Sequence, residues 1–112
     1  MPATPGSTVL CCLEGSRPLL VEVQALVSTS SYGQARRMAV GIEQNRLSLL
    51  LAVLEKRAGL GFAQLDVFVN VVGGMRLQEP AGDLAVAAAL ASSIYDRALT
   101  PDAIFLGEVG LG

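Results

Sequence analysis

Two early stretches of the chain favour β-strands, because the first is β-prone and the second alternates apolar and polar residues. The first stretch is 7–13 (STVLCCL), and the second is 19–27 (LLVEVQALV), which places Val21, Val23 and Ala25 on one face. Between them, residues 14–18 (EGSRP) supply the glycine and proline of a turn. The pattern therefore predicts an early β-hairpin.

A helical period follows between residues 43 and 58. Apolar side chains recur there at i, i+3, i+4, i+7 and i+11, at Leu47, Leu50, Leu51, Leu54 and Ala58. Gly59 stands where a left-handed C-terminal cap is expected, and Lys56 and Arg57 suit the negative end of a helix. The sequence predicts an amphipathic helix over 43–58.

Shorter patterns predict the remaining elements. The polar segment 28–37 indicates a loop that returns as a short strand over 38–40, and 66–72 (DVFVNVV) indicates a strand ended by two glycines. Pro80 suits the first turn of a second helix, which is apolar nearly all round from Leu84 and should be buried. A turn at 100–102 should lead to a final strand at 103–106.

This order of elements predicts one α+β domain, with a mixed β-sheet and an early hairpin packed on two main helices. At 112 residues and 52% hydrophobic composition, the chain can bury a core as a single domain. We expect residues 1–6 to form a flexible lead-in and residues 7–112 to form the domain.

Charge and cysteine content narrow the partners and the compartment. The net charge of −2 gives no global attraction to nucleic acid or to an anionic membrane, and no apolar run has the length of a membrane span. Cys11 and Cys12 are adjacent, so they cannot form an ordinary disulfide and supply at most half a zinc site. We expect a cytoplasmic protein with no membrane partner.

The residue types that are absent exclude most catalysis. Without histidine there is no Ser-His-Asp or Cys-His arrangement, and the one lysine, Lys56, follows no glycine-rich turn that could form a P-loop. A Ser-Lys dyad remains possible in principle, but Lys56 lies at a helix end where an ammonium group is ordinarily solvated. We expect no catalytic residue, no metal site and no cofactor in this chain.

One basic cluster stands out. Arg36 and Arg37 lie in the polar loop near Tyr32, and Arg46 lies one helical turn into the following helix. Such a loop can stack on bases and contact phosphates. In a second interpretation, which the residues alone favour, the arginines are solvated and pair with local acids such as Glu43.

Several stretches together resemble the RadA (Sms) family of bacterial DNA repair proteins. They are 14–27 (EGSRPLLVEVQALV), 45–47 (NRL) followed by 49–57 (LLLAVLEKR), 66–67 (DV) with 69–71 (VNV), and 105–111 (FLGEVGL). The resemblance extends from Gly6 to Gly112, and the first and third stretches are its most distinctive parts.

The resemblance implies a part in a ring-forming, cytoplasmic ATPase of recombinational repair that drives branch migration of DNA. It also implies that this chain is the Lon-protease-like C-terminal domain, incomplete at its C-terminal end. ATP, Mg²⁺ and Zn²⁺ would then belong to other parts of the parent protein. The partners implied are single-stranded or branched DNA, further copies in a hexameric ring, and a RecA-type recombinase.

The comparison with Lon implies a pseudo-protease. Lon proteases carry their nucleophilic serine within Gly-Pro-Ser-Ala-Gly, and the matching residues here are 79–83 (EPAGD), which place Ala81 at the nucleophile position. The lysine of the Lon dyad would lie beyond Gly112. We expect no proteolysis.

Two functional hypotheses follow. In the first, the domain supports ring assembly and DNA binding, and Arg36, Arg37 and Arg46 contact nucleic acid. In the second, it is a purely structural oligomerisation module, or a non-functional fragment, without DNA contact. A degenerate Ser-Lys peptidase is a distant third.

Overall fold

The computed structural model describes residues 4–31, 33–78, 80–99 and 103–111. Over these residues the chain forms a four-stranded sheet with the strand order β1-β2-β4-β3 and two α-helices. Strand β3 runs parallel to β4, and the other pairs are antiparallel, so the sheet is mixed. The elements are β1 (Ser7–Glu14), β2 (Arg17–Thr29), β3 (Arg37–Val40), α1 (Gln44–Ala58), β4 (Leu65–Val71), a 3₁₀ turn η1 (Pro80–Gly82) and α2 (Asp83–Ile94). This confirms the α+β prediction.

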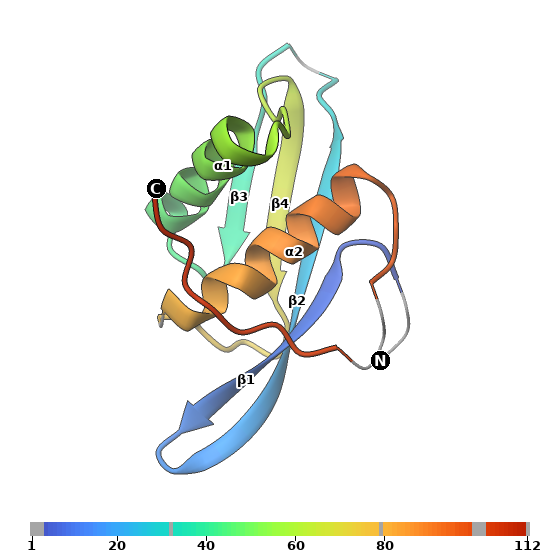
Figure 1. Cartoon of the computed structure of the whole chain (residues 1–112). Helices are drawn as coiled ribbons and strands as arrows, with labels where there is room; N and C mark the ends of the chain where they lie inside the picture. The colour runs from blue at the N-terminus through green and yellow to red at the C-terminus, as the bar shows by residue number, and fades with distance from the viewer. Residues whose placement is uncertain (1–3, 32, 79, 100–102, 112) are drawn as a thin grey trace.

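Strands β1 and β2 form the predicted hairpin, and its tip extends beyond the other elements (Figure 1). The pairing runs from Ser7 opposite Gln24 to Glu14 opposite Arg17, which leaves Gly15 and Ser16 as the turn. Gly15 has φ +64°, a conformation that glycine adopts without steric cost. The hairpin is therefore well specified by its turn residues.

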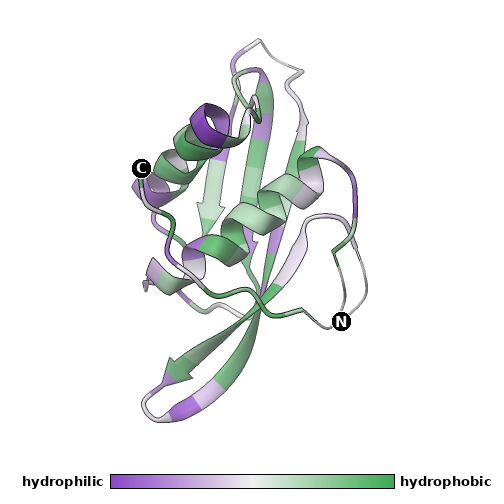
Figure 2. Cartoon of the chain, in the orientation of Figure 1, coloured by the Kyte–Doolittle hydropathy of each residue, from purple (hydrophilic) through white to green (hydrophobic). Residues whose placement is uncertain are grey.

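Both helices pack on one face of the sheet, and α2 crosses the middle of that face (Figure 1). Apolar residues concentrate along α2 and on the strands behind it (Figure 2). The core contains the residues that the strand and helix patterns predict, namely Val21, Val23, Ala25, Leu47, Leu50, Leu51, Val67, Val69, Val71, Ala85, Val86, Ala89 and Leu90. The prediction that α2 is buried is confirmed.

Helix α1 agrees closely with its predicted range. Its last residue is Ala58, and Gly59 adopts the left-handed conformation with φ +71°. Leu54 is only partly buried and Ala58 is exposed, because the end of the helix extends past the edge of the core. The predicted apolar stripe therefore covers the first three turns of the helix and not the last.

The predicted final strand at 103–106 is wrong. Residues 103–111 are extended, and their side chains alternate between partly buried and exposed, but they form no ladder with β1. One backbone bond joins them to β1, from Phe105 N–H to the Val9 carbonyl at 2.8 Å, and the segment then turns away to α2. There the Gly107 N–H binds the Ala81 carbonyl and the Gly107 carbonyl accepts from Leu84 N–H, so these backbone groups are satisfied outside a sheet. The predicted turn at 100–102 lies outside the described residues.

Candidate functional site

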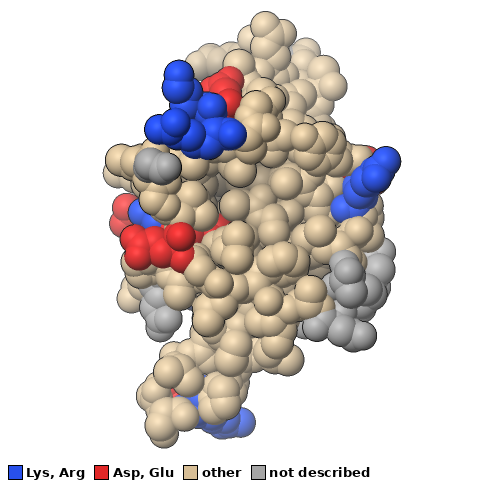
Figure 3. Space-filling model, in the orientation of Figure 1, with Lys and Arg blue, Asp and Glu red and all other residues tan. Residues whose placement is uncertain are grey.

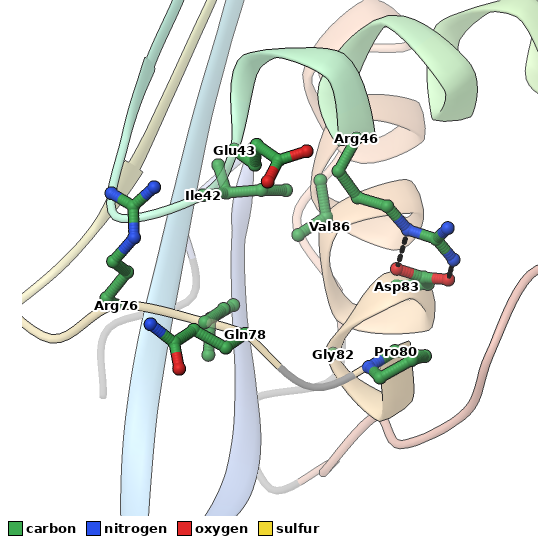
Figure 4. Close-up of a pocket in the computed structure, with 10 residues that line it drawn as sticks. Ile42, Glu43, Arg46, Arg76, Gln78, Pro80, Gly82, Asp83 and Val86 are labelled. Carbon is green, nitrogen blue, oxygen red and sulfur yellow. Dashed lines mark hydrogen bonds and ion pairs between the residues drawn. The ribbon is translucent and has the colours of Figure 1, made fainter.

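A pocket of about 420 Å³ lies between the start of α1, the start of α2 and the segment before η1 (Figure 4). Its wall on the helix side is an ion pair between Arg46 and Asp83. The Arg46 Nε donates to Asp83 Oδ1 at 2.8 Å, and Arg46 Nη2 donates to Asp83 Oδ2. This two-point geometry fixes the guanidinium in the wall of the pocket.

Asp83 is 3% exposed, yet both of its oxygens are satisfied. Besides Arg46, the backbone N–H of Val109 donates to Oδ2 at 3.0 Å. The hydrogen bonds that Arg46 donates to Asp83 raise the pKa of Arg46 above its ordinary value, against the opposing effect of desolvation. The pair thus joins α1, α2 and the C-terminal segment, and it carries no net charge.

Other polar side chains line the pocket, at Glu43, Arg76 and Gln78, above a floor that includes Ile42 and Val86 (Figure 4). The sequence analysis did not identify Arg76 or Gln78. They lie on an irregular segment that reaches the pocket because Leu77 bridges to Ile42 and donates its N–H to the Gly41 carbonyl at 2.6 Å. The sequence held one signal of this buried charge pair. It is Asp83, an acidic residue at the start of an apolar helix.

Arg36 lies at the other end of β3 and pairs with Asp66, the second residue of β4. Its backbone N–H donates to Asp66 Oδ1 at 2.8 Å and its Nη2 to Oδ2 at 3.1 Å. The backbone hydrogen bond, followed by the side-chain bond, lowers the pKa of Asp66 below its ordinary value of 3.8. The Arg36 side chain is 54% exposed and lies over the ring of Phe68, 5.5 Å from its centroid.

Arg37 points to the opposite face of the sheet, as the alternation along a strand requires. Its Nη1 donates to the backbone carbonyls of Leu65 and Arg36, and its Nη2 donates to that of Phe62 at 2.7 Å. These bonds fasten the loop before β4 to the start of β3. Arg37 therefore has a structural role in the monomer.

The three predicted nucleic-acid-binding arginines do not form one patch. Arg36 and Arg37 contact the start of β4 from opposite faces, whereas Arg46 contacts α2. On the face that Figure 3 shows, one larger group of basic side chains lies at the upper left, and the other basic side chains lie apart from it. Tyr32 lies outside the described residues. Nucleic-acid contact by these arginines stays a prediction, and a phosphate would have to compete with the partners described above.

Ala81, at the predicted degenerate nucleophile position, lies in η1 and lines a second pocket of about 200 Å³. The wall of this pocket is the outer part of β1, at Leu10 to Leu13, and the segment 75–78. The Ala81 side chain offers no nucleophilic atom, and its carbonyl accepts from Gly107 N–H at 2.8 Å. Lys56 lies in the last turn of α1, and it does not line this pocket.

Among the residues that the structure describes, no group of three or more His, Cys, Asp or Glu side chains is placed to hold a metal ion. Cys12 is buried, Cys11 is partly exposed, and neither forms a disulfide. No helix in the described part of the chain has the length and apolar character needed to cross a membrane.

Comparison with known proteins shows that the chain is similar to DNA repair proteins of several bacteria. The chain is 56% identical over 108 residues to the DNA repair protein RadA of Escherichia coli (strain K12), and 53% identical over 106 residues to that of Bacillus subtilis (strain 168). These alignments cover 96% and 95% of the chain, but only 24% and 23% of the relatives. The chain thus spans about a quarter of the length of the curated relatives it matches. No family model matches it.

Proposed function

The chain matches RadA DNA repair proteins over nearly its whole length, and from this premise we propose that it is a non-catalytic, Lon-like domain of a RadA-type repair protein. In this proposal it supports ring assembly and DNA binding during branch migration in the cytoplasm. The observation that carries the proposal is the identity of 52–56% to RadA over about 96% of the chain. The activity of the whole protein, including any use of ATP, Mg²⁺ or Zn²⁺ and any RecA-type partner, would reside in the longer parent.

The chemistry of the described residues supports a non-enzymatic role. Ala81 stands where a serine nucleophile would be needed, the chain has no histidine, and its only lysine lies in the last turn of α1. The pocket between the starts of α1 and α2 is lined by a charge pair whose members satisfy each other. These features fit a scaffold better than an active site.

Arg36 is the best candidate for DNA contact among the three arginines. More than half of its side chain is exposed, whereas Arg37 binds three backbone carbonyls and Arg46 is held by buried Asp83. An exposed guanidinium beside an aromatic ring can contact a phosphate and stack near a base. We therefore place the proposed DNA contact at Arg36 and Phe68.

The test is the salt dependence of single-stranded DNA binding by the 112-residue chain and its Arg36→Gln variant. A lost phosphate contact should weaken binding and reduce the slope of log K against log salt by about 0.7. The matched control is Arg97→Gln, which removes the same charge from an exposed position just after α2. Equal effects of the two substitutions would contradict a contact at Arg36, and so would an unchanged slope.

A second function, a structural oligomerisation module without DNA contact, is favoured by a specific observation. Five large apolar side chains of the sheet are more than half exposed, at Leu13, Leu20, Leu26, Met38 and Val40. Under this alternative the chain self-associates, yet shows no salt-dependent binding to single-stranded DNA.

A further inference from the structure

The pocket between the starts of α1 and α2 has an apolar floor. Ile42 and Val86 are buried, and Leu77 is partly buried. These three side chains come from different segments, namely the residues before α1, helix α2 and the segment 75–78. The bridge between Ile42 and Leu77 holds two of those segments together. The floor is therefore a preformed surface on which an apolar group can lie away from water.

Two charged side chains at the rim of the pocket keep their charges. Glu43 lies beside the start of α1, Arg76 lies on the segment 75–78, and both are exposed (Figure 4). Over the described ranges no hydrogen bond or ion pair holds either side chain, and the two do not pair with each other. A ligand in the pocket would therefore meet one negative and one positive group.

The ion pair in the wall adds hydrogen-bond donors without adding net charge. Arg46 uses Nε and Nη2 to bind Asp83, so their charges cancel, and the N–H groups on Nη1 have no partner among the described residues. Gln78 contributes a side-chain amide that can both donate and accept. Because Asp83 fixes Arg46 at two points, this wall is already ordered before a ligand arrives.

The charges at the rim select the class of ligand. A simple anion near Arg76 would be repelled by Glu43, and a simple cation near Glu43 would be repelled by Arg76. A molecule that carries one group of each sign can satisfy both. The apolar floor then favours a zwitterion that also carries an apolar side chain.

We propose that this pocket binds a small zwitterion with an apolar side chain, of which an apolar α-amino acid is the simplest. Its carboxylate contacts Arg76, its ammonium group contacts Glu43, and its side chain lies on the apolar floor. The volume of about 420 Å³ is within the range of roughly 300–1,000 Å³ that is usual for small-molecule sites. The proposed DNA contact at Arg36 lies on the other face of the sheet, so this inference goes beyond the proposed function and does not depend on it.

The first experiment follows the backbone amide signals of the ¹⁵N-labelled 112-residue chain by NMR while L-leucine is added. We expect saturable shifts that centre on Glu43, Gln78 and Val86, which line the pocket. Three analogues each lack one group of leucine. They are 4-methylpentanoate without the ammonium group, 3-methylbutylamine without the carboxylate, and glycine without the apolar side chain. Each should bind at least about threefold more weakly than leucine.

Two variants test the assignment of the charged groups. Glu43→Gln and Arg76→Gln should each weaken leucine binding at least about threefold. The matched control is Glu14→Gln/Arg17→Gln, which removes one charge of each sign from exposed positions at the hairpin turn, and it should bind leucine like the wild type. All four substituted side chains are exposed, and amide spectra that are unchanged away from the substitutions confirm that each variant is folded.

Combining variants with analogues assigns each contact separately. In Glu43→Gln the ammonium group has lost its partner, so leucine and 4-methylpentanoate should bind equally. In Arg76→Gln the carboxylate has lost its partner, so leucine and 3-methylbutylamine should bind equally. The proposal is overturned if leucine gives no saturable shifts, if 4-methylpentanoate or 3-methylbutylamine binds the wild type as tightly as leucine does, or if the control weakens leucine binding as much as the pocket variants do.

Discussion

At the scale of single residues, the charges near the candidate site are neutralised by acids that are distant in sequence. In one of the two interpretations of the sequence the arginines pair with local acids such as Glu43, whereas in the structure Arg36 binds Asp66 and Arg46 binds Asp83. These partners are 30 and 37 residues apart, and only the packing of β3 on β4 and of α1 on α2 brings them together. The need for a pair was predictable from the sequence, but its members were not.

Arg46→Met should destabilise the fold by leaving the carboxylate of Asp83 buried without its counter-ion. A fully buried pair loses about 3–5 kcal/mol when one partner is removed, and the partial exposure of Arg46 should reduce this to about 2 kcal/mol. Urea unfolding measures the loss. Arg76→Met is the control, since Arg76 lines the same pocket without a described ion pair, and it should change stability by less than about 0.5 kcal/mol.

Adding Asp83→Asn to Arg46→Met should recover part of the lost stability. A further loss would show that the buried carboxylate is not the source of the cost.

Asp66 should make stability depend on pH in the acid range. Its pKa is lowered in the folded state, so its ionised form stabilises the fold above the unfolded pKa of about 3.8. This contribution decreases as pH falls below that value and is lost once pH falls through the lower pKa of the folded state. Urea unfolding between pH 7 and pH 2.5 should therefore show a steeper acid loss for the wild type than for Asp66→Asn. Parallel profiles for the two proteins would contradict the assignment.

At the scale of elements, regular periods and turn residues identified the strands and helices, and an irregular segment defines the pocket. The periods of 43–58 and of the valine-rich strands depend on which side chains face the core, which a sequence displays directly. The segment 75–78 has no such period. It is held by the contact of Gly41 with Leu77, so neither Arg76 nor Gln78 could be assigned to a pocket in advance.

Gly41→Ala should open this contact. Gly41 has φ +84°, and an added Cβ would lie 2.6 Å from the Met75 carbonyl oxygen and 2.6 Å from Val71 Cβ. Gly59→Ala is the matched control, because Gly59 also has a positive φ but nothing within 4 Å of the added Cβ. Backbone strain alone should cost Gly59→Ala about 1–2 kcal/mol, and the clash should cost Gly41→Ala about 1–3 kcal/mol more. Thermal or urea unfolding of the two variants compares them, and equal losses would show that the space around Gly41 is not constrained.

At the scale of the whole molecule, the α+β architecture and the core were predictable, whereas the path of the C-terminal segment was not. The short apolar run 103–106 indicated a strand, and in the structure its side chains alternate between partly buried and exposed positions. The backbone partners are instead divided among β1, η1 and α2, and Val109 donates to Asp83. An apolar run indicates that a segment packs against the core, but it does not specify the backbone partner.

Phe105→Ala should show that this segment stabilises the domain although it belongs to no regular element. Phe105 packs against the core and its N–H binds the carbonyl of Val9, so the segment joins the edge of the sheet to the start of α2. Truncation of a fully buried phenylalanine lowers the free energy of unfolding by about 3–5 kcal/mol, and partial burial should reduce this loss to about 1.5–2.5 kcal/mol.

The control is Leu111→Ala, which truncates a side chain that is 66% exposed in the same segment and should cost less than about 0.5 kcal/mol. Urea unfolding compares the two, and a small loss for Phe105→Ala would mean that the segment only lies along the surface. A loss of the expected size would mean that β1 and α2 are held together partly from outside the sheet, through Phe105.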